Sequence, residues 1–170
     1  MATDYLSIGA NLSQNRNPFN YEKVEEIGRD ISTQWLTLDE IAQQIIRLLP
    51  YRAWRSEHLV ITGGEPLLGW QRVYPDLLEH PSMADLVNLT FETNGTQKLH
   101  ADFAQFLAQW QKEVPGREVT FSVSAKLSAS GELWDEAIKP DVVNEYQQHG
   151  HTYLKFVVET DEHVIEAIKA

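Results

Sequence analysis

The stretch His58-Leu59-Val60-Ile61-Thr62-Gly63-Gly64-Glu65-Pro66-Leu67 decides the fold of this chain. Its first half is short, apolar and rich in β-branched residues, which predicts a buried strand that the two glycines end. Gly63 and Gly64 allow backbone amides to turn toward a ligand and approach it closely, and Glu65 adds an anionic acceptor. This pairing suits a zwitterion, with the amides facing a carboxylate and Glu65 facing an ammonium group. A plain exit from strand to turn is the alternative interpretation.

Similar strand patterns recur about every 30 residues, each followed by a helical pattern, as in consecutive βα units. This alternation predicts parallel strands with right-handed crossovers. Four units form an open sheet, and five or six form a partial or complete barrel. In either case ligands bind at the carboxyl ends of the strands. The expected strands cover 58–62, 87–92, 119–124 and 152–158, and the expected helices cover 70–79, 101–113, 133–148 and a segment from about 161.

The character of the sequence changes near residue 37, from an irregular segment to regular helical and strand patterns. Residues 1–36 read as an irregular segment, rich in Asn, Gln and Pro over 11–21, with one short charged helix as an option over 21–29. Thr37 followed by Glu40 is a capping-box pattern. The apolar residues behind it recur on one helical face until Pro50 ends the helix. We therefore expect one structured domain over 37–170.

Composition limits the classes of partner. The 170 residues suit a single domain, and 25 acidic against 14 basic side chains give a net charge of -11. Binding to nucleic acid or to an anionic membrane requires a basic surface, so neither is expected. We find no apolar run near the ~20 residues of a membrane span and no secretory signal, so a cytoplasmic location is expected. The absence of cysteine excludes disulfides.

Polar residues follow each expected strand, where parallel strands place a ligand site. Glu92 ends the second strand and begins Glu92-Thr93-Asn94-Gly95-Thr96, and Lys155 lies in the fourth. A carboxylate beside a buried run needs a partner, either a ligand hydroxyl or ammonium group or a lysine such as Lys126. Ser122, Ser124 and Lys126 alternate along the third strand and share one face. This face either points toward the site or is simply exposed to solvent. Because polar residues follow each of the expected strands, we favour the interpretation that it points toward the site.

Three segments in order resemble a known family. Thr62-Gly63-Gly64-Glu65-Pro66 resembles the methionine-binding motif of radical S-adenosylmethionine enzymes. With residues 92–96 and Ser124-Ala125-Lys126-Leu127, the chain is similar to 7-carboxy-7-deazaguanine synthases over residues 37–169, including the strand around Leu154-Lys155-Phe156-Val157-Val158. That family usually has proline at the position of Ala125. The resemblance implies a partial (βα) barrel of the radical S-adenosylmethionine type, with four parallel βα units present.

The resemblance also implies ligands and roles. Members convert 6-carboxytetrahydropterin to 7-carboxy-7-deazaguanine in queuosine and deazapurine biosynthesis, with a 4Fe-4S cluster, Mg²⁺ and a reductant such as flavodoxin; a homodimer is compatible with this. Thr93 and Asn94 would line the pocket of the pterin substrate. The residues that would bind S-adenosylmethionine are Gly63, Gly64, Glu65, Glu92, Ser124 and Lys126.

The departure from the family lies before residue 37. The family's first strand, its Cys-x3-Cys-x2-Cys loop and its magnesium-binding threonine are expected there, and the chain has no cysteine to hold a cluster. The sequence therefore reads as an internal fragment of a longer enzyme, inactive alone, with an exposed apolar edge beside the strand over 58–62. A glycyl-radical activase, which usually has Asp in place of Glu92, and a cluster-free paralogue that binds adenosine ligands or a protein are the alternatives.

Overall fold

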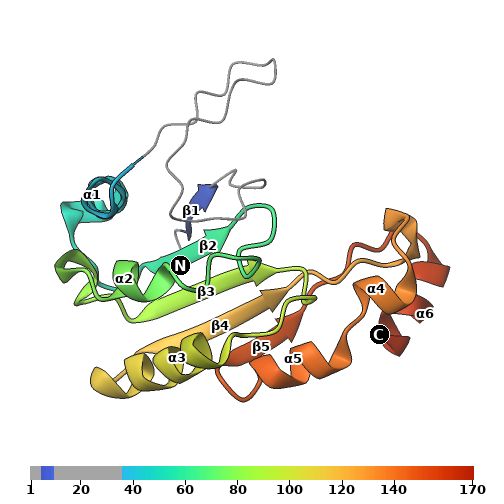
Figure 1. The fold of residues 1–170 in the computed structure, drawn as a ribbon. Helices are drawn as coiled ribbons and strands as arrows, with labels where there is room; N and C mark the ends of the chain where they lie inside the picture. Colours follow the sequence, from blue (N-terminus) through green and yellow to red (C-terminus); the bar gives the residue numbers. More distant parts are fainter. Residues whose placement is uncertain (1–4, 10–35) are drawn as a thin grey trace, which may run out of the picture.

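The computed structural model describes residues 5–9 and 36–170, which form an α/β fold with one all-parallel sheet (Figure 1). The five strands lie in the order β1-β2-β3-β4-β5, the order of the sequence. They are β1 (Tyr5–Gly9), β2 (His58–Thr62), β3 (Asn88–Thr93), β4 (Glu118–Val123) and β5 (His151–Leu154). The α-helices are α1 (Leu38–Leu48), α2 (Tyr74–Leu78), α3 (Ala101–Glu113), α4 (Trp134–Ala137), α5 (Pro140–Tyr146) and α6 (Asp161–Lys169), and the 3-10 helices are η1 (Pro50–Arg52), η2 (Pro81–Met83) and η3 (Ser128–Ser130).

The four strands expected from the sequence are present, parallel and adjacent in sequence order, which confirms the βα reading. The helix over 101–113 is confirmed in full, and Thr37 and Glu40 form the capping box at the start of α1. The helix expected over 133–148 is divided into α4 and α5. Pro140 explains the division, since it lacks the amide proton that a continuous helix needs and begins α5 instead.

The expectation that residues 1–36 lack regular structure is wrong at β1. This strand pairs in parallel with β2 from Tyr5 opposite His58 to Gly9 opposite Thr62. The edge of β2 is therefore covered by a strand, and the exposed apolar edge expected there is not found. Parallel pairing with β2 defines this element, which the sequence analysis did not distinguish from the segment around it. The helix expected over 21–29 lies outside the described residues.

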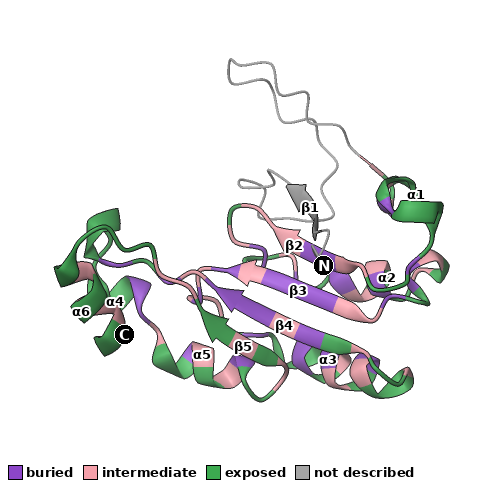
Figure 2. Cartoon of the chain, turned by 180° about the vertical axis from the view of Figure 1, so that it is seen from behind, coloured by how far each residue is buried: buried purple, intermediate pink, exposed green. Residues whose placement is uncertain are grey.

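The two faces of the sheet differ in chemistry. The rings of Phe91 and Phe121, in β3 and β4, contact Tyr74 of α2, Phe103 of α3 and Tyr146 of α5. These contacts form the centre of the apolar core on one side of the sheet. Successive residues of a strand point to opposite faces, so Glu92 and Ser122, which follow Phe91 and Phe121, belong to the other face. Figure 2 views the sheet from the side opposite to that of Figure 1.

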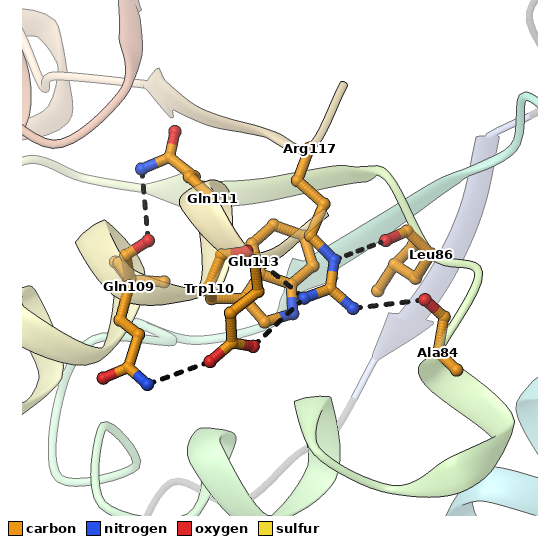
Figure 3. A network of polar contacts seen from close by, with 8 residues as sticks. Ala84, Leu86, Gln109, Trp110, Gln111, Glu113 and Arg117 are labelled. Carbon is orange, nitrogen blue, oxygen red and sulfur yellow. Dashed lines mark hydrogen bonds and ion pairs between the residues drawn. The ribbon is translucent and has the colours of Figure 1, made fainter. Parts of the chain in front are cut away.

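Arg117 fastens the amino-terminal end of β4 to the core (Figure 3). Its guanidinium group donates to the carbonyl oxygens of Ala84, Leu86 and Trp110, each at 3.2 Å. It also lies 4.4 Å from the ring centroid of Trp110. The planar group thus binds two segments that the chain itself does not connect directly, the turn before β3 and the end of α3.

None of the helices in the described parts of the chain has the length and apolar character needed to cross a lipid bilayer.

Candidate functional site

Glu65 joins two of the loops at the carboxyl end of the sheet. Its Oε1 accepts hydrogen bonds from the Thr93 hydroxyl at 2.7 Å and from the Leu67 amide at 3.0 Å. Its Oε2 accepts from the amide of Asn94 at 2.7 Å. A carboxylate has about four acceptor positions, so three are used within the protein and one is left for a ligand. The side chain assigned to an ammonium group is therefore first of all a bridge between the loops after β2 and β3.

The glycines before Glu65 adopt left-handed backbone conformations. Gly63 has φ 104° and Gly64 has φ 53°. A Cβ atom on Gly64 would meet nothing within 4 Å, so the backbone conformation and not crowding favours glycine there. Two successive residues with positive φ turn the chain sharply after β2. This turn places Glu65 where it reaches the end of β3.

Three buried side chains form hydrogen bonds to the backbone of these loops. Gln71, 1% exposed, donates to the carbonyl oxygens of Leu67 and Lys98 and accepts from the His100 amide. The hydroxyl of Tyr74 donates to the Pro66 carbonyl, and that of Tyr146 donates to the Gln97 carbonyl. Burial, with the nearby charge of Glu65 as a lesser cause, raises the pKa of both tyrosines far above the ordinary value. The two hydroxyl groups therefore stay protonated, and able to donate, in solutions alkaline enough to ionise an ordinary tyrosine. The loops that they hold are 65–67 and 93–98.

Glu92 forms the second polar centre of this end of the sheet. Its Oε1 lies 3.1 Å from Nζ of Lys155, and its Oε2 accepts from the Thr62 hydroxyl at 3.2 Å. The side chains of Glu92 and Lys155 are each 42% exposed, so the pair is open to a ligand. The lysine partner of Glu92 in the described chain is thus Lys155, and the suggested partner Lys126 is exposed beyond β4.

The other expected site residues divide by position. Ser124 follows β4, half-buried, with its amide bonded to the Thr93 carbonyl. Thr93 is 2% exposed, and its hydroxyl is used by Glu65, so it supports the site from within. The Asn94 side-chain oxygen accepts from the amide and hydroxyl of Thr96. Asn94 also lines a cavity of about 150 Å³ beside Gly95, at the start of α5.

Three residues at this end had no assigned ligand role, although the sequence analysis placed Ser122 and Lys155 among the polar residues of the strand ends. Lys155 and Thr62 enter through their bonds to Glu92, and Ser122 through its place opposite Glu92 in the register. Their position directly at the ends of strands was the available signal. The sequence could not show that side chains of β2, β3 and β5 meet at one carboxylate.

Metal ligands are not gathered here. Among residues 5–9 and 36–170, no group of three or more His, Cys, Asp or Glu side chains could hold a metal ion. The polar groups that the described residues do bring to this end of the sheet are the half-exposed Glu92–Lys155 pair, hydroxyl groups and backbone amides.

No protein-family model matches the chain, and neither a curated protein nor a solved structure shows significant similarity to it.

Proposed function

We propose that this chain binds S-adenosylmethionine at the carboxyl end of its sheet, as an α/β protein of the 7-carboxy-7-deazaguanine synthase type. The observation that supports this best is the meeting of the motif segments, through Glu65, between residues 62–66 and 92–96. S-adenosylmethionine carries an amino acid and a ribose, which need charged groups and hydroxyl-binding groups. Glu92, Lys155 and the amides of Gly63 and Gly64 offer these in one place.

Strand order supports a partial barrel as the frame of this site. Doubly wound sheets reverse their strand order at a switch point and bury both faces under helices. Here the order is sequential, and α2, α3 and α5 contact the same face. Sequential order with helices outside is the arrangement of (βα) barrels. The face that carries Glu92 and Ser122 would be the inner face of that partial barrel.

The charged and hydroxyl groups of S-adenosylmethionine have matching partners among the side chains at the strand ends. The exposed carboxylate of Glu92 has acceptor positions beyond those used by Thr62 and Lys155. Lys155 and Lys126 are cations that suit the ligand carboxylate, and Ser124 follows β4 two residues before Lys126. The free acceptor position of Glu65 suits the ammonium group. Asn94 is half-buried and therefore more accessible to a pterin substrate than Thr93, which is 2% exposed.

The cluster and magnesium of that family do not fit this chain. A 4Fe-4S cluster needs thiolate ligands, and the sequence contains no cysteine. The described residues also offer no group of carboxylates and histidines for a metal ion. We therefore propose ligand binding for this chain and derive no radical step from it.

A titration of the ¹⁵N-labelled chain with S-adenosylmethionine tests the proposal. We expect weak binding, with Kd on the order of millimolar, since a few hydrogen bonds must offset the entropy lost on binding. Amide shifts should centre on Gly63, Gly64 and Asn94. Glu92→Gln should raise Kd, whereas Glu118→Gln, exposed at the opposite end of the sheet, should not. Shifts that map away from these strand ends, or equal Kd values in both variants, would contradict the site.

Reconstitution separates binding from catalysis. After anaerobic incubation with iron and sulfide, the chain should show no cluster absorbance and release no 5′-deoxyadenosine from S-adenosylmethionine. A stable cluster with turnover would refute the claim that this chain binds without cleaving.

A further inference from the structure

The segment from Arg47 to Arg55 concentrates positive charge in an acidic chain. Three of the seven arginines lie within these nine residues and no acidic residue does, whereas the whole chain has a net charge of -11. The segment covers the end of α1, the 3-10 helix η1 and the residues that lead into β2. It therefore lies at the amino-terminal edge of the sheet, opposite the strand ends that carry Glu65 and Glu92 (Figure 1).

The three arginines form no ion pair within the described residues. Arg47, Arg52 and Arg55 are all exposed, and the ion pairs of residues 5–9 and 36–170 involve other side chains. The guanidinium group of Arg55 lies 4.5 Å from the ring centroid of Tyr51. Arg117 differs, because it is 6% exposed and donates to three carbonyl oxygens of the fold. The arginines of this segment thus present their charge to solvent.

The turn between α1 and β2 has a strained backbone. Tyr51 and Arg52 have φ values of 60° and 54°, and the other described residues with positive φ are glycines. This left-handed conformation costs free energy in a bulky residue. Trp54 Nε1 donates to a carbonyl oxygen of η2 at 2.8 Å, and Glu57 Oε2 accepts from two backbone amides, so the turn is held at both ends. Strain retained at an exposed turn points to a function of the side chains there.

Exposed apolar side chains alternate with these charges along the segment. Tyr51 is 81% exposed and Leu48 is 60% exposed. Tyrosine and arginine are among the residue types that contribute most binding energy at protein interfaces. A guanidinium group also matches a carboxylate through two parallel hydrogen bonds. We call this surface the arginine patch, and it consists of Arg47, Leu48, Tyr51, Arg52 and Arg55.

We propose that the arginine patch is a docking surface for an acidic polypeptide segment. Carboxylates of the partner would pair with the guanidinium groups, and an apolar side chain would pack against Leu48 and Tyr51. Charge complementarity favours this occupant over a nucleic acid or an anionic membrane, because an extended array of phosphates would also meet the acidic remainder of the chain. The inference does not depend on ligand binding at the opposite edge of the sheet.

A labelled peptide of the sequence Asp-Glu-Leu-Asp-Glu-Phe-Asp-Glu tests the proposal by fluorescence anisotropy. Arg52→Asn should raise its Kd about two- to fivefold, the effect of one exposed charge pair. Asparagine tolerates the left-handed conformation, so this variant removes the charge and keeps the turn. Arg72→Asn is the matched control, because Arg72 is exposed outside the patch and its loss changes the net charge equally. The Kd of this control should equal that of the wild-type chain.

Comparison peptides and other polyanions separate the alternatives. The same peptide with Asn and Gln in place of Asp and Glu should not bind, and replacement of its Leu and Phe by Gly should weaken binding. Absence of binding at about 1 mM acidic peptide, or equal Kd values for Arg52→Asn and Arg72→Asn, would overturn the inference. Tighter binding of a DNA duplex or of phosphatidylserine vesicles, weakened by Arg52→Asn, would overturn it in favour of that class of partner.

Thermal unfolding of the free chain gives an independent measurement. Arg52→Gly removes the exposed charge and relieves the left-handed strain, so its Tm should be unchanged or raised while its Kd for the acidic peptide rises as in Arg52→Asn. A clear fall in Tm would show that the side chain of Arg52 supports the free fold, and would overturn the inference.

Discussion

The carboxylate of Glu65 accepts a hydrogen bond from the backbone amide of Asn94 at 2.7 Å, across 29 residues of sequence. With the Thr93 hydroxyl and the Leu67 amide as further donors, it connects the ends of β2 and β3. The residue that the motif reading assigned to a ligand is thus a structural bridge as well.

Replacement of Glu65 should therefore destabilise the free protein. Glu65→Ala leaves two backbone amides and one hydroxyl without their acceptor, and we expect a loss of about 3 kcal/mol in the free energy of unfolding. Glu65→Gln keeps one acceptor oxygen and should lose less. Urea unfolding measures both, with Glu118→Ala at the exposed start of β4 as control. A Glu65→Ala variant as stable as that control would show that the bridge contributes nothing.

Gly95 should tolerate no side chain. It has φ 80°, and a Cβ atom there would lie 2.6 Å from Cγ1 of Val123. Gly116 has φ 90° with nothing within 4 Å of its Cβ position, so Gly116→Ala carries the backbone strain alone, about 1–2 kcal/mol. Gly95→Ala should lose about 1–3 kcal/mol more by overpacking. Thermal or urea unfolding of both variants measures the difference in the free energy of unfolding that they lose. Combined with Gly95→Ala, the substitution Val123→Ala should reduce the loss that comes from the overlap with Cγ1 of Val123.

Arg117 should matter for stability far more than an ordinary surface arginine. Its side chain is 6% exposed and donates to three carbonyl oxygens. Arg117→Ala should lose about 2 kcal/mol in the free energy of unfolding, since the partly buried carbonyl groups of Leu86 and Trp110 lose a charged donor. Arg117→Lys should recover only part of this, because an ammonium group cannot match the planar fork. Arg47→Ala is the control, because Arg47 is exposed in α1. Equal urea midpoints for Arg117→Ala and Arg47→Ala would contradict the expectation.

The start of α1 should depend on pH through Glu40. The amide of Thr37, and after it the Thr37 hydroxyl, lower the pKa of Glu40 below 4.5. A carboxyl group with a lowered folded-state pKa stabilises the fold above its unfolded value and loses this contribution as pH falls through the lowered pKa. The protection factor of the Thr37 amide, which compares its exchange with that of an unstructured peptide at the same pH, should therefore fall as pH drops below 4.5. Glu40→Gln, which does not titrate, should remove this dependence, and a wild-type chain with pH-independent opening there would refute it.

Local patterns in the sequence determined much of the secondary structure. The apolar run over 58–62 and the helical pattern over 101–113 became β2 and α3 with the expected bounds. Thr37 and Glu40 formed the capping box because its contacts lie within one helical turn. Alternation of strands and helices was enough to predict a parallel sheet in sequence order. The same alternation predicted that the polar residues after the strands lie at one edge of the sheet.

Tertiary structure decided the partners within the site. The sequence pattern left residues 5–9 irregular, and pairing with β2 made them a strand. Glu92 found Lys155, 63 residues away, and Ser122 became buried beneath that pair. Glu65 turned toward the end of β3 because two positive φ angles aim it there. Each of these outcomes depends on strand order and register, which long-range packing sets and which no short window of sequence encodes.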